Sequence, residues 1–334
     1  NRLALLGLRA DGFEDAARAA IARHGADRVA LILGTSTSGM LSAELAYRER
    51  DAGGALPAWF DYARTHNTGS LVAFVRELLG VRGPAFAIST ACSSSAKAFA
   101  AADRLIAAGL ADAAVVGGVD SLCLTTLYGF NSLELLSPDP CRPYDARRNG
   151  ISIAEAAAFA LLERPGAAAS SPAAADGDVL RLVGTGESSD AHHMSSPHPE
   201  GLGARLAMSR ALDSAGLAPT DVDYMNLHGT ATPSNDLAED LAVHAVFDGR
   251  VPVSSTKAAH GHTLGAAGAL EAVIALLCLR EGLMPAGLNC DAPDPALRSP
   301  YLTANRTAPL RVVMSNSFGF GGVNGSLLFD RIAS

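Results

Sequence analysis

The segment 85–97, AFAISTACSSSAK, joins an apolar run to a run of small residues through Cys92. The apolar run predicts a buried strand, and the Ser- and Ala-rich run predicts a tightly packed helix from Cys92 to position 108. At such a junction, unpaired backbone N–H groups and the positive end of the helix dipole favour a thiolate. The segment alone leaves two interpretations open: a reactive cysteine, or a small buried hydrophobe, which most free cysteines are.

Strand-like and helix-like segments alternate through the rest of the chain. Predicted strands lie at 28–33, 113–116, 179–183, 222–227, 251–254 and 311–314, and predicted helices at 3–23, 202–215, 235–247 and 265–280, while 154–162 fits either. This alternation predicts an α/β fold with mostly parallel sheets. The Ala-, Pro- and Ser-rich segment 164–178 predicts a linker or surface loop. We therefore expect an N-terminal half at 1–163, this linker at 164–178, and a C-terminal half at 179–334.

Composition favours a large core and excludes several classes of protein. Hydrophobic residues make up 49% of the 334 residues but aromatic residues only 5%, so abundant Ala and Gly must pack backbone close to backbone. The net charge of −8 argues against a nucleic-acid partner. The most apolar helix-like segment, 266–279, contains Glu271 and is shorter than the ~20 residues of a membrane span, so we expect no membrane partner.

The cysteines indicate a reducing, cytoplasmic setting. They form no CxxC pair and no metal-ligand spacing, and their number is odd: Cys92, Cys123, Cys141, Cys278 and Cys290. His192, His193 and His198 cluster in a loop, but acidic ligands are sparse there and we expect no metal site.

Three further segments carry polar residues in turns rich in Gly, Ser and Thr. They are 228–236 (HGTATPSND), 254–268 (SSTKAAHGHTLGAAG) and 316–326 (NSFGFGGVNGS). A cysteine combined with His228, Lys257 and His262 suits acyl transfer through a thioester. A single histidine in a turn is more often structural, but this number of polar turns is hard to assign to packing.

With these motifs the chain resembles the β-ketoacyl-acyl-carrier-protein synthases, in the Cys-His-His branch of the thiolase superfamily. The resemblance runs from about residue 28 to 329 and rests on TACSSS, HGTATPSND, STK…GHTLGAAG and NSFGFGGVNGS. It implies a thiolase-like, duplicated, five-layered αβαβα fold. The strand, loop and helix with which family members begin have no counterpart before residue 3, so the first sheet is expected to lack that N-terminal strand region.

The resemblance implies a role for each residue of the catalytic set. Cys92 matches the nucleophile, and His228 and His262 match the pair that promotes loss of CO2 from a malonyl group. Lys257 matches a lysine that orders the site, and we expect it to pair with Glu239. The backbone N–H groups of Cys92 and Phe320 are expected to form the oxyanion hole, with Phe320 also gating the acyl chain.

Other positions match substrate-binding residues. Thr230 and Thr232 match the residues that hydrogen-bond the phosphopantetheine amides, and Ser195 lies in a loop at the tunnel mouth. Gly319 permits close backbone approach beside Phe320. Phe130 and Ile151 are expected at the acyl pocket, together with Tyr128 and Leu133. Ile151 and His260 depart from the family pattern, and we expect a pocket reshaped for a non-standard chain.

The leading hypothesis is a 3-oxoacyl-[acyl-carrier-protein] synthase of fatty acid biosynthesis, with no cofactor beyond the carrier's phosphopantetheine. The alternative is a ketosynthase of an aryl polyene or type II polyketide pathway, paired with a chain-length-factor subunit. A non-catalytic binding subunit and a simple acyltransferase are disfavoured by Cys92 and Lys257. The expected partners are an acyl carrier protein, docking on arginines 142, 147 and 148, and a homodimeric or paralogous subunit meeting segments 59–71 and 84–90.

Overall fold

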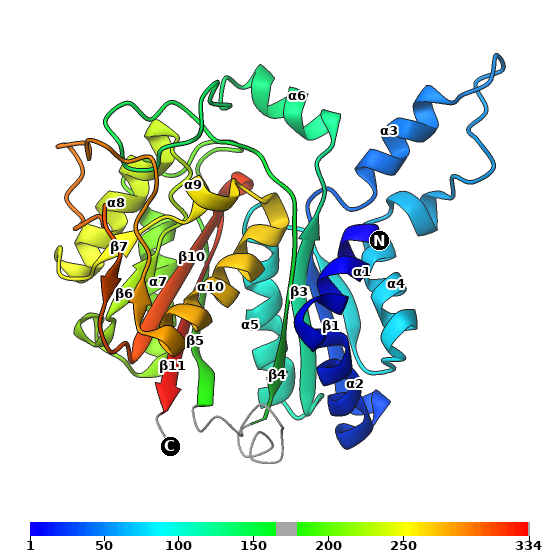
Figure 1. Ribbon diagram of the computed structural model, residues 1–334, viewed down its shortest axis with the longest axis horizontal. Helices are drawn as coiled ribbons and strands as arrows, with labels where there is room; N and C mark the ends of the chain where they lie inside the picture. Colours follow the sequence, from blue (N-terminus) through cyan, green and yellow to red (C-terminus); the bar gives the residue numbers. More distant parts are fainter. Residues whose placement is uncertain (165–178, 333–334) are drawn as a thin grey trace.

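The computed structural model describes residues 1–164 and 179–332, which form two β-sheets lying side by side (Figure 1). The strand order is β2–β1–β3–β4 in the first sheet and β5–β11–β10–β6–β7 in the second. The strands of the first sheet are β1 (Val29–Gly34), β2 (Ala85–Ile88), β3 (Ala113–Asp120) and β4 (Ala156–Glu163). Those of the second are β5 (Val179–Ser189), β6 (Tyr224–Asn226), β7 (Val253–Ser254), β10 (Val312–Gly319) and β11 (Val323–Ile332).

Helices cover the outer faces of both sheets and fill the space between them (Figure 1). The central helices are α5 (Ser94–Ala107) and α10 (Ala267–Glu281). The outer helices are α1 (Arg2–Arg9), α2 (Phe13–His24) and α4 (Gly69–Leu79) on the first sheet, and α7 (Leu202–Ala215) and α8 (Pro233–Phe247) on the second. The five-layered αβαβα arrangement expected from the sequence is therefore confirmed.

Further, smaller elements complete the described part of the chain. They are α3 (Met40–Arg48), a π-helical turn (Tyr62–His66), α6 (Leu124–Ser132), α9 (Lys257–His260) and the short pair β8 (Leu283–Met284) and β9 (Arg306–Thr307). Single 3₁₀ turns lie at Ala10–Gly12, Ala26–Arg28, Pro219–Asp221, Leu264–Ala266 and Phe320–Gly322. Among the helices of residues 1–164 and 179–332, none combines the length and apolar character needed to cross a bilayer.

Strand β1 shows why the sheets must be covered on both faces. Every residue from Val29 to Gly34 is buried, and successive side chains point to opposite faces. Leu31 packs into the outer cluster with α1, α2 and α4, whereas Ile32 packs into the central cluster with α5 and α10. A strand buried on both faces reads as a continuous apolar run, as this one does.

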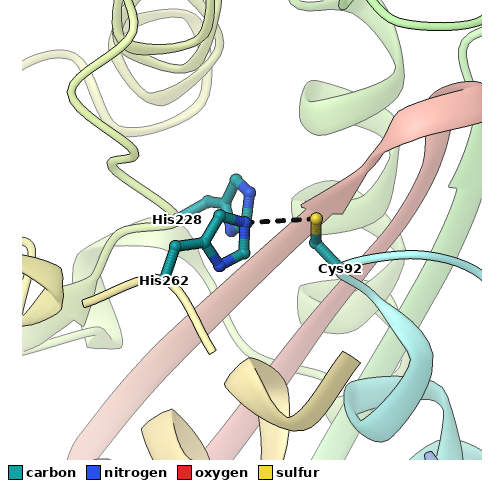
Figure 2. A group of neighbouring side chains, drawn as sticks. All are labelled: Cys92, His228 and His262. Carbon is teal, nitrogen blue, oxygen red and sulfur yellow. Dashed lines mark hydrogen bonds between the residues drawn. The ribbon is translucent and has the colours of Figure 1, made fainter. Parts of the chain in front are cut away.

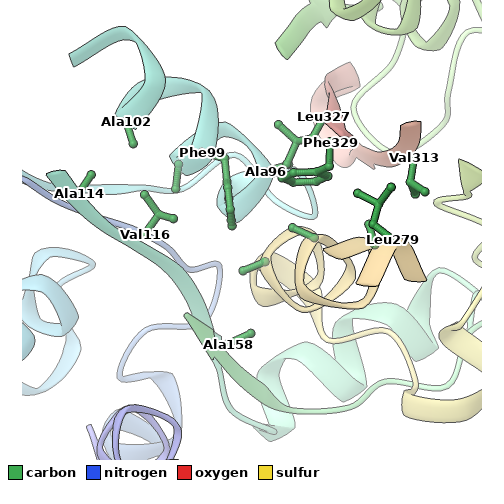
Figure 3. Packing of buried hydrophobic residues seen from close by; sticks show 14 of the residues in the cluster. Ala96, Phe99, Ala102, Ala114, Val116, Ala158, Leu279, Val313, Leu327 and Phe329 are labelled. Atoms are coloured by element: carbon green, nitrogen blue, oxygen red, sulfur yellow. The ribbon is translucent and has the colours of Figure 1, made fainter. Parts of the chain in front are cut away.

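The central layer is packed at backbone distance. A Cβ added at Gly34 would lie 2.3 Å from the backbone nitrogen of Ser95, and one at Gly268 would lie 2.5 Å from that of Ala96. Around this contact, Phe99 of α5 meets Phe329 of β11 edge to face at 6.2 Å (Figure 3). Small residues therefore let α5 and α10 bring both sheets together, which places the residues that precede these helices side by side.

Three expectations about the fold are wrong. The predicted helix 3–23 is two helices, because Asp11 and Gly12 have φ values of 51° and 73° that a helix cannot contain. Helix α5 begins at Ser94 rather than Cys92. The sheets are mixed: β1 pairs in parallel with β2 and β3, but β3–β4, β10–β11 and β11–β5 are antiparallel. The tight Phe320–Gly322 turn forces the β10–β11 pair to be antiparallel.

The proposed division into halves agrees with where the two sheets begin and end. The first sheet uses residues up to Glu163 and the second begins at Val179. The predicted linker, apart from Arg164, lies outside the described residues. The division at 1–163, 164–178 and 179–334 stays a prediction.

Candidate active site

The polar residues singled out in the sequence meet at one end of the molecule. Cys92 follows β2 and precedes α5, and His228 follows β6. Lys257 begins α9 after β7, and His262 follows α9. Because β1 with β2 and β10 with β6 and β7 run parallel, the carboxyl ends of these strands deliver the residues to one place.

Cys92, His228 and His262 form a buried group (Figure 2). His262 Nε2 lies 3.1 Å from Cys92 Sγ. The two imidazole rings stand nearly perpendicular, with centroids 5.3 Å apart. One ligand-type atom from each side chain lies within 4.8 Å of the others, so a single bound atom can touch all three.

The hydrogen-bond network assigns the proton of each imidazole. His262 Nδ1 accepts from the backbone N–H of Leu264 at 3.3 Å, and His228 Nδ1 accepts from Lys257 Nζ at 3.3 Å. Burial, and then the Lys257 ammonium, hold the pKa of both histidines well below the usual value, so both rings are neutral. A neutral imidazole with Nδ1 accepting carries its proton on Nε2. The site therefore offers two neutral N–H donors beside a thiol.

This protonation does not suit a metal ion. By distance alone, the Cys92, His228 and His262 group could hold one. Binding through Nε2, however, requires a lone pair where these rings carry a proton, and Lys257 places a positive charge next to His228. Within the described residues, His192, His193 and His198 do not belong to any cluster with metal-ligand spacing.

The expected pairing of Lys257 with Glu239 is wrong. Lys257 Nζ donates to Glu271 Oε1 at 2.5 Å, and both side chains are fully buried. Glu239 instead accepts from the backbone N–H groups of His228, at 2.8 Å, and Gly229, at 2.7 Å. Burial raises the pKa of each carboxyl group, Glu239 and Glu271, to about 7. We call Lys257, Glu271, His228 and Glu239 the buried wall of the site.

Glu271 lies at the site but was not predicted as a member of it. In the sequence it stands out only as a charge that interrupts an apolar segment, although a lone carboxylate in a central helix of Ala, Leu and Ile requires a buried partner. Asp236, by contrast, braces its loop, because it accepts from the backbone N–H groups of Ala231 and Tyr144. It also receives an ionic contact from Arg148 at 3.7 Å.

The expected thiolate at Cys92 is not the resting form. Burial raises the pKa of the Cys92 thiol to about 11, against the opposing effects of Lys257 and of the backbone N–H of Phe320. Cys92 lies outside the first turn of α5, where the helix dipole acts most strongly. Cys92 is therefore a neutral thiol, and Lys257 and the Phe320 amide are the groups that favour its ionisation.

A cavity of about 60 Å³ opens onto Cys92. Six of the predicted substrate-binding residues line it: Phe130, Ile151, Ser195, Thr230, Thr232 and Gly319. The Thr230 and Thr232 hydroxyls are hydrogen-bonded at 3.0 Å, and Thr232 also caps α8. The ring of Phe130 lies 5.3 Å from that of Phe320.

Two residues expected at the cavity lie elsewhere, and others were missed. Tyr128 is 69% exposed and Leu133 49% exposed, and neither lines the cavity. The lining residues that were not predicted from the sequence include Leu135, Asn235 and Phe318. Their side chains reach the site only through the folding of α6, α8 and β10.

The expected docking arginines also differ in availability. Arg148 is nearly buried and donates to Asp294 at 2.6 Å, so it cannot contact a partner protein. Arg147 is exposed, and pairs with Asp145 and Asp291. A docking surface there would rest on Arg147 and Arg142.

The chain is similar to known proteins along most of its length. Residues 4–168 match the family described as "Beta-ketoacyl synthase, N-terminal domain", and residues 180–291 match "Beta-ketoacyl synthase, C-terminal domain". The chain is 40% identical over 268 residues to the mitochondrial 3-oxoacyl-[acyl-carrier-protein] synthase of Arabidopsis thaliana, covering 76% of this chain and 58% of that protein. It is also 40% identical over 264 residues to 3-oxoacyl-[acyl-carrier-protein] synthase 2 of Rhizobium meliloti (strain 1021), covering 75% and 62%. The chain thus spans less than two thirds of the length of these relatives.

One solved structure is similar over a larger share. It is the ketosynthase ApeO in complex with its chain length factor ApeC from Xenorhabdus doucetiae, with a TM-score of 0.88 and 42% identity. The match covers 99% of this chain and 80% of the solved chain.

Proposed function

Since the chain belongs to the β-ketoacyl synthase family, we propose that it is a 3-oxoacyl-[acyl-carrier-protein] synthase of fatty acid biosynthesis. It condenses malonyl-carrier protein with an acyl chain held on Cys92. The observation that carries this proposal is the pair of neutral Nε2–H donors beside the Cys92 thiol. Such donors can stabilise the negative charge on an enolate oxygen while remaining neutral themselves.

The first step loads the acyl chain onto Cys92. Its sulfur attacks the thioester carbonyl of acyl-carrier protein, and the proton of the Cys92 thiol leaves with the phosphopantetheine thiol. The backbone N–H groups of Cys92 and Phe320 stabilise the tetrahedral oxyanion. Their placement follows from the close approach of two turns, because a Cβ at Gly319 would lie 3.2 Å from the Cys92 nitrogen.

The second step forms the new carbon–carbon bond. The malonyl carboxylate leaves as CO2, and its electron pair becomes the enolate of the carrier thioester, whose oxygen accepts from His228 and His262. The enolate carbon attacks the Cys92 thioester, and the carbon–sulfur bond breaks to release the 3-oxoacyl product and the thiolate. Lys257, held by Glu271, keeps His228 in the tautomer that donates.

The cavity supports delivery of the substrate on a flexible arm. Thr230, Thr232 and Ser195 offer hydroxyls that suit the amides of a phosphopantetheine, while Phe130 and Ile151 offer apolar surface for an acyl chain. The phosphopantetheine arrives with the acyl carrier protein, and we propose no redox cofactor or catalytic metal. A cytoplasmic location is consistent with five free cysteines, all buried.

A second candidate function is supported by the similarity to ApeO. That protein is a ketosynthase solved with a chain length factor, and its match covers nearly the whole of this chain. On this alternative the chain serves a secondary pathway and pairs with a paralogous subunit rather than with itself. Ile151 and His260, which depart from the family pattern, favour it.

The proposal is tested by mass spectrometry of the protein mixed with malonyl-carrier protein and a panel of acyl-carrier proteins. We expect an acyl adduct on the Cys92 peptide, followed by a 3-oxoacyl-carrier product, and neither with Cys92→Ala. A preference for saturated chains supports the fatty acid assignment, and a preference for polyene chains supports the second candidate. An adduct that is only hydrolysed, with malonyl-carrier protein left intact, would contradict condensation.

A further inference from the structure

Helix α6 lies across one end of the molecule and is anchored at its two ends (Figure 1). Each of its nine residues is half-buried or exposed. At its C-terminal end, the backbone N–H of Leu135 donates to the Phe130 carbonyl at 3.1 Å, and that of Ile151 donates to the Leu135 carbonyl at 2.8 Å. We call residues 124–132 the α6 strap, because its position depends on these anchors rather than on a buried face.

The other anchor comes from a different helix. Glu44 of α3 accepts from the backbone N–H groups of Leu124, at 3.0 Å, and Thr125, at 2.6 Å. These are first-turn donors that a helix cannot satisfy internally, and a carboxylate there also meets the positive end of the helix dipole. The N-cap residue Cys123 directs its own side chain to the Thr126 hydroxyl at 3.0 Å instead.

The charge of Glu44 is preserved by these contacts. Burial opposes its ionisation, yet the hydrogen bonds from Thr125 and Leu124 hold its pKa below the usual value. The anchor is therefore a charge-assisted one, and such hydrogen bonds are stronger than neutral ones.

The strap reaches the site through one ring. Phe130 lines the cavity and lies 5.3 Å from the ring of Phe320, whose backbone N–H faces the Cys92 sulfur. Phe130 lies five positions after Thr125, so a shift of the first turn of the strap moves the cavity wall. Among the described residues, no hydrogen bond or ion pair links Glu44 to the buried wall.

We propose that Glu44 is a positioning residue for acyl-chain selection. Its carboxylate fixes the first turn of the α6 strap and thereby sets where Phe130 stands in the acyl cavity. This inference rests on the proposed function, because it assumes that the cavity holds an acyl chain.

The test compares Glu44→Ala and Glu44→Gln with Glu49→Gln. Glu49 is the matched control, because it lies just past the same helix but accepts from Trp59 Nε1 at 2.8 Å. Hydrogen exchange of peptide 124–132 measures how often the strap opens, and exchange of peptide 317–324 measures the same for the Phe320 turn. The chain-length preference of Cys92 acylation and CO2 release from malonyl-carrier protein report the two sides of the site.

For Glu44→Ala we expect exchange of 124–132 to accelerate about tenfold, the size of one lost helix cap, with faster exchange at 317–324. Long-chain preference should fall by a similar factor while CO2 release stays unchanged. Glu44→Gln, which keeps one acceptor oxygen and the same shape, should lie between, and Glu49→Gln should match the wild type.

Faster exchange in the strap with an unchanged chain preference and an unchanged 317–324 peptide would overturn the inference and leave Glu44 a purely structural cap. Absence of CO2 release from the wild type would contradict the proposed function instead. The response of the 317–324 peptide to Glu44→Ala would still decide whether Glu44 controls the Phe320 turn.

Discussion

The buried wall and the α6 strap both contribute to the cavity at Cys92 but are held in different ways. In the buried wall, a Lys257–Glu271 ion pair and backbone donors to Glu239 fix His228 with every partner removed from solvent. The strap is half-exposed and depends on Glu44 and on backbone contacts near Leu135. Hydrogen bonds and an ion pair removed from solvent therefore hold the groups around Lys257, whereas the Phe130 side of the cavity depends on a few contacts near the surface.

The largest effect should come from the ion pair of the buried wall. Glu271→Gln leaves the Lys257 ammonium buried without a counter-charge, and we expect unfolding free energy to fall by about 3–5 kcal/mol in denaturant titrations. Lys257→Met combined with Glu271→Gln removes both charges and should recover most of that stability. CO2 release should be lost in both variants. The double variant lacks the Lys257 ammonium that donates to His228 Nδ1, and Glu271→Gln lacks the carboxylate that aligns this ammonium. A stable, fully active Glu271→Gln would show that the wall does not depend on this pair.

A second prediction concerns the pKa of Cys92, which burial raises to about 11. The thiolate fraction, and with it the rate of alkylation by iodoacetamide, should rise about tenfold per pH unit from pH 7 to 10. Mass spectrometry of the Cys92 peptide gives the rate, and Cys92→Ala identifies reaction at the other cysteines. A rate that levels off near neutral pH would mean that Lys257 and the helix outweigh burial.

A substitution in the strap should change acyl-chain discrimination more than stability. Phe130→Ala removes a ring that contacts Phe320, and we expect a loss of only about 1 kcal/mol in unfolding free energy. Discrimination between long and short acyl chains in Cys92 loading should fall about tenfold, the scale of one apolar contact in a pocket. CO2 release from malonyl-carrier protein should be retained. Loss of CO2 release in this variant would remove the distinction between the two sides of the site.

The smallest effect is expected at an exposed residue of the strap. Tyr128 lies on the same strap but is 69% exposed and outside the cavity. Tyr128→Ala should change unfolding free energy by less than about 0.5 kcal/mol and leave chain preference as in the wild type. A changed preference would show that the strap acts through its surface rather than through Phe130.

The local sequence pattern predicted where helices and strands lie better than it predicted whether paired strands run parallel or antiparallel. The helix expected at 202–215 is Leu202–Ala215, and the strand expected at 28–33 is Val29–Gly34, because burial periodicity is a local property. Periodicity carries no information on strand direction, so the antiparallel β3–β4 and β11–β5 pairs were missed. The break between α1 and α2 depends on positive φ at Asp11 and Gly12, and the Asp-Gly pair is a turn signal that the helix prediction for 3–23 did not use.

Most residues of the site were predicted from the sequence, but the hydrogen-bond and ion-pair partners of these residues were not. Motif residues such as His228 and His262 are brought together by the fold, and their chemical roles stay predictions. Partners such as Glu271 for Lys257, and Glu44 for α6, were not predicted, because the choice among several carboxylates depends on packing between distant segments. The protonation state of Cys92 was misjudged for the same reason, since burial by surrounding segments outweighs the local helix end.

The proposed chemistry requires that His228 and His262 present neutral Nε2–H groups beside Cys92. Imidazole nitrogen NMR of the ¹⁵N-labelled protein at pH 7 measures this protonation, with His228→Gln and His262→Gln assigning the signals. We expect Nε2 to be protonated and Nδ1 to be unprotonated in both rings. A signal of the doubly protonated imidazolium, or of the Nδ1–H tautomer, from either residue would contradict it.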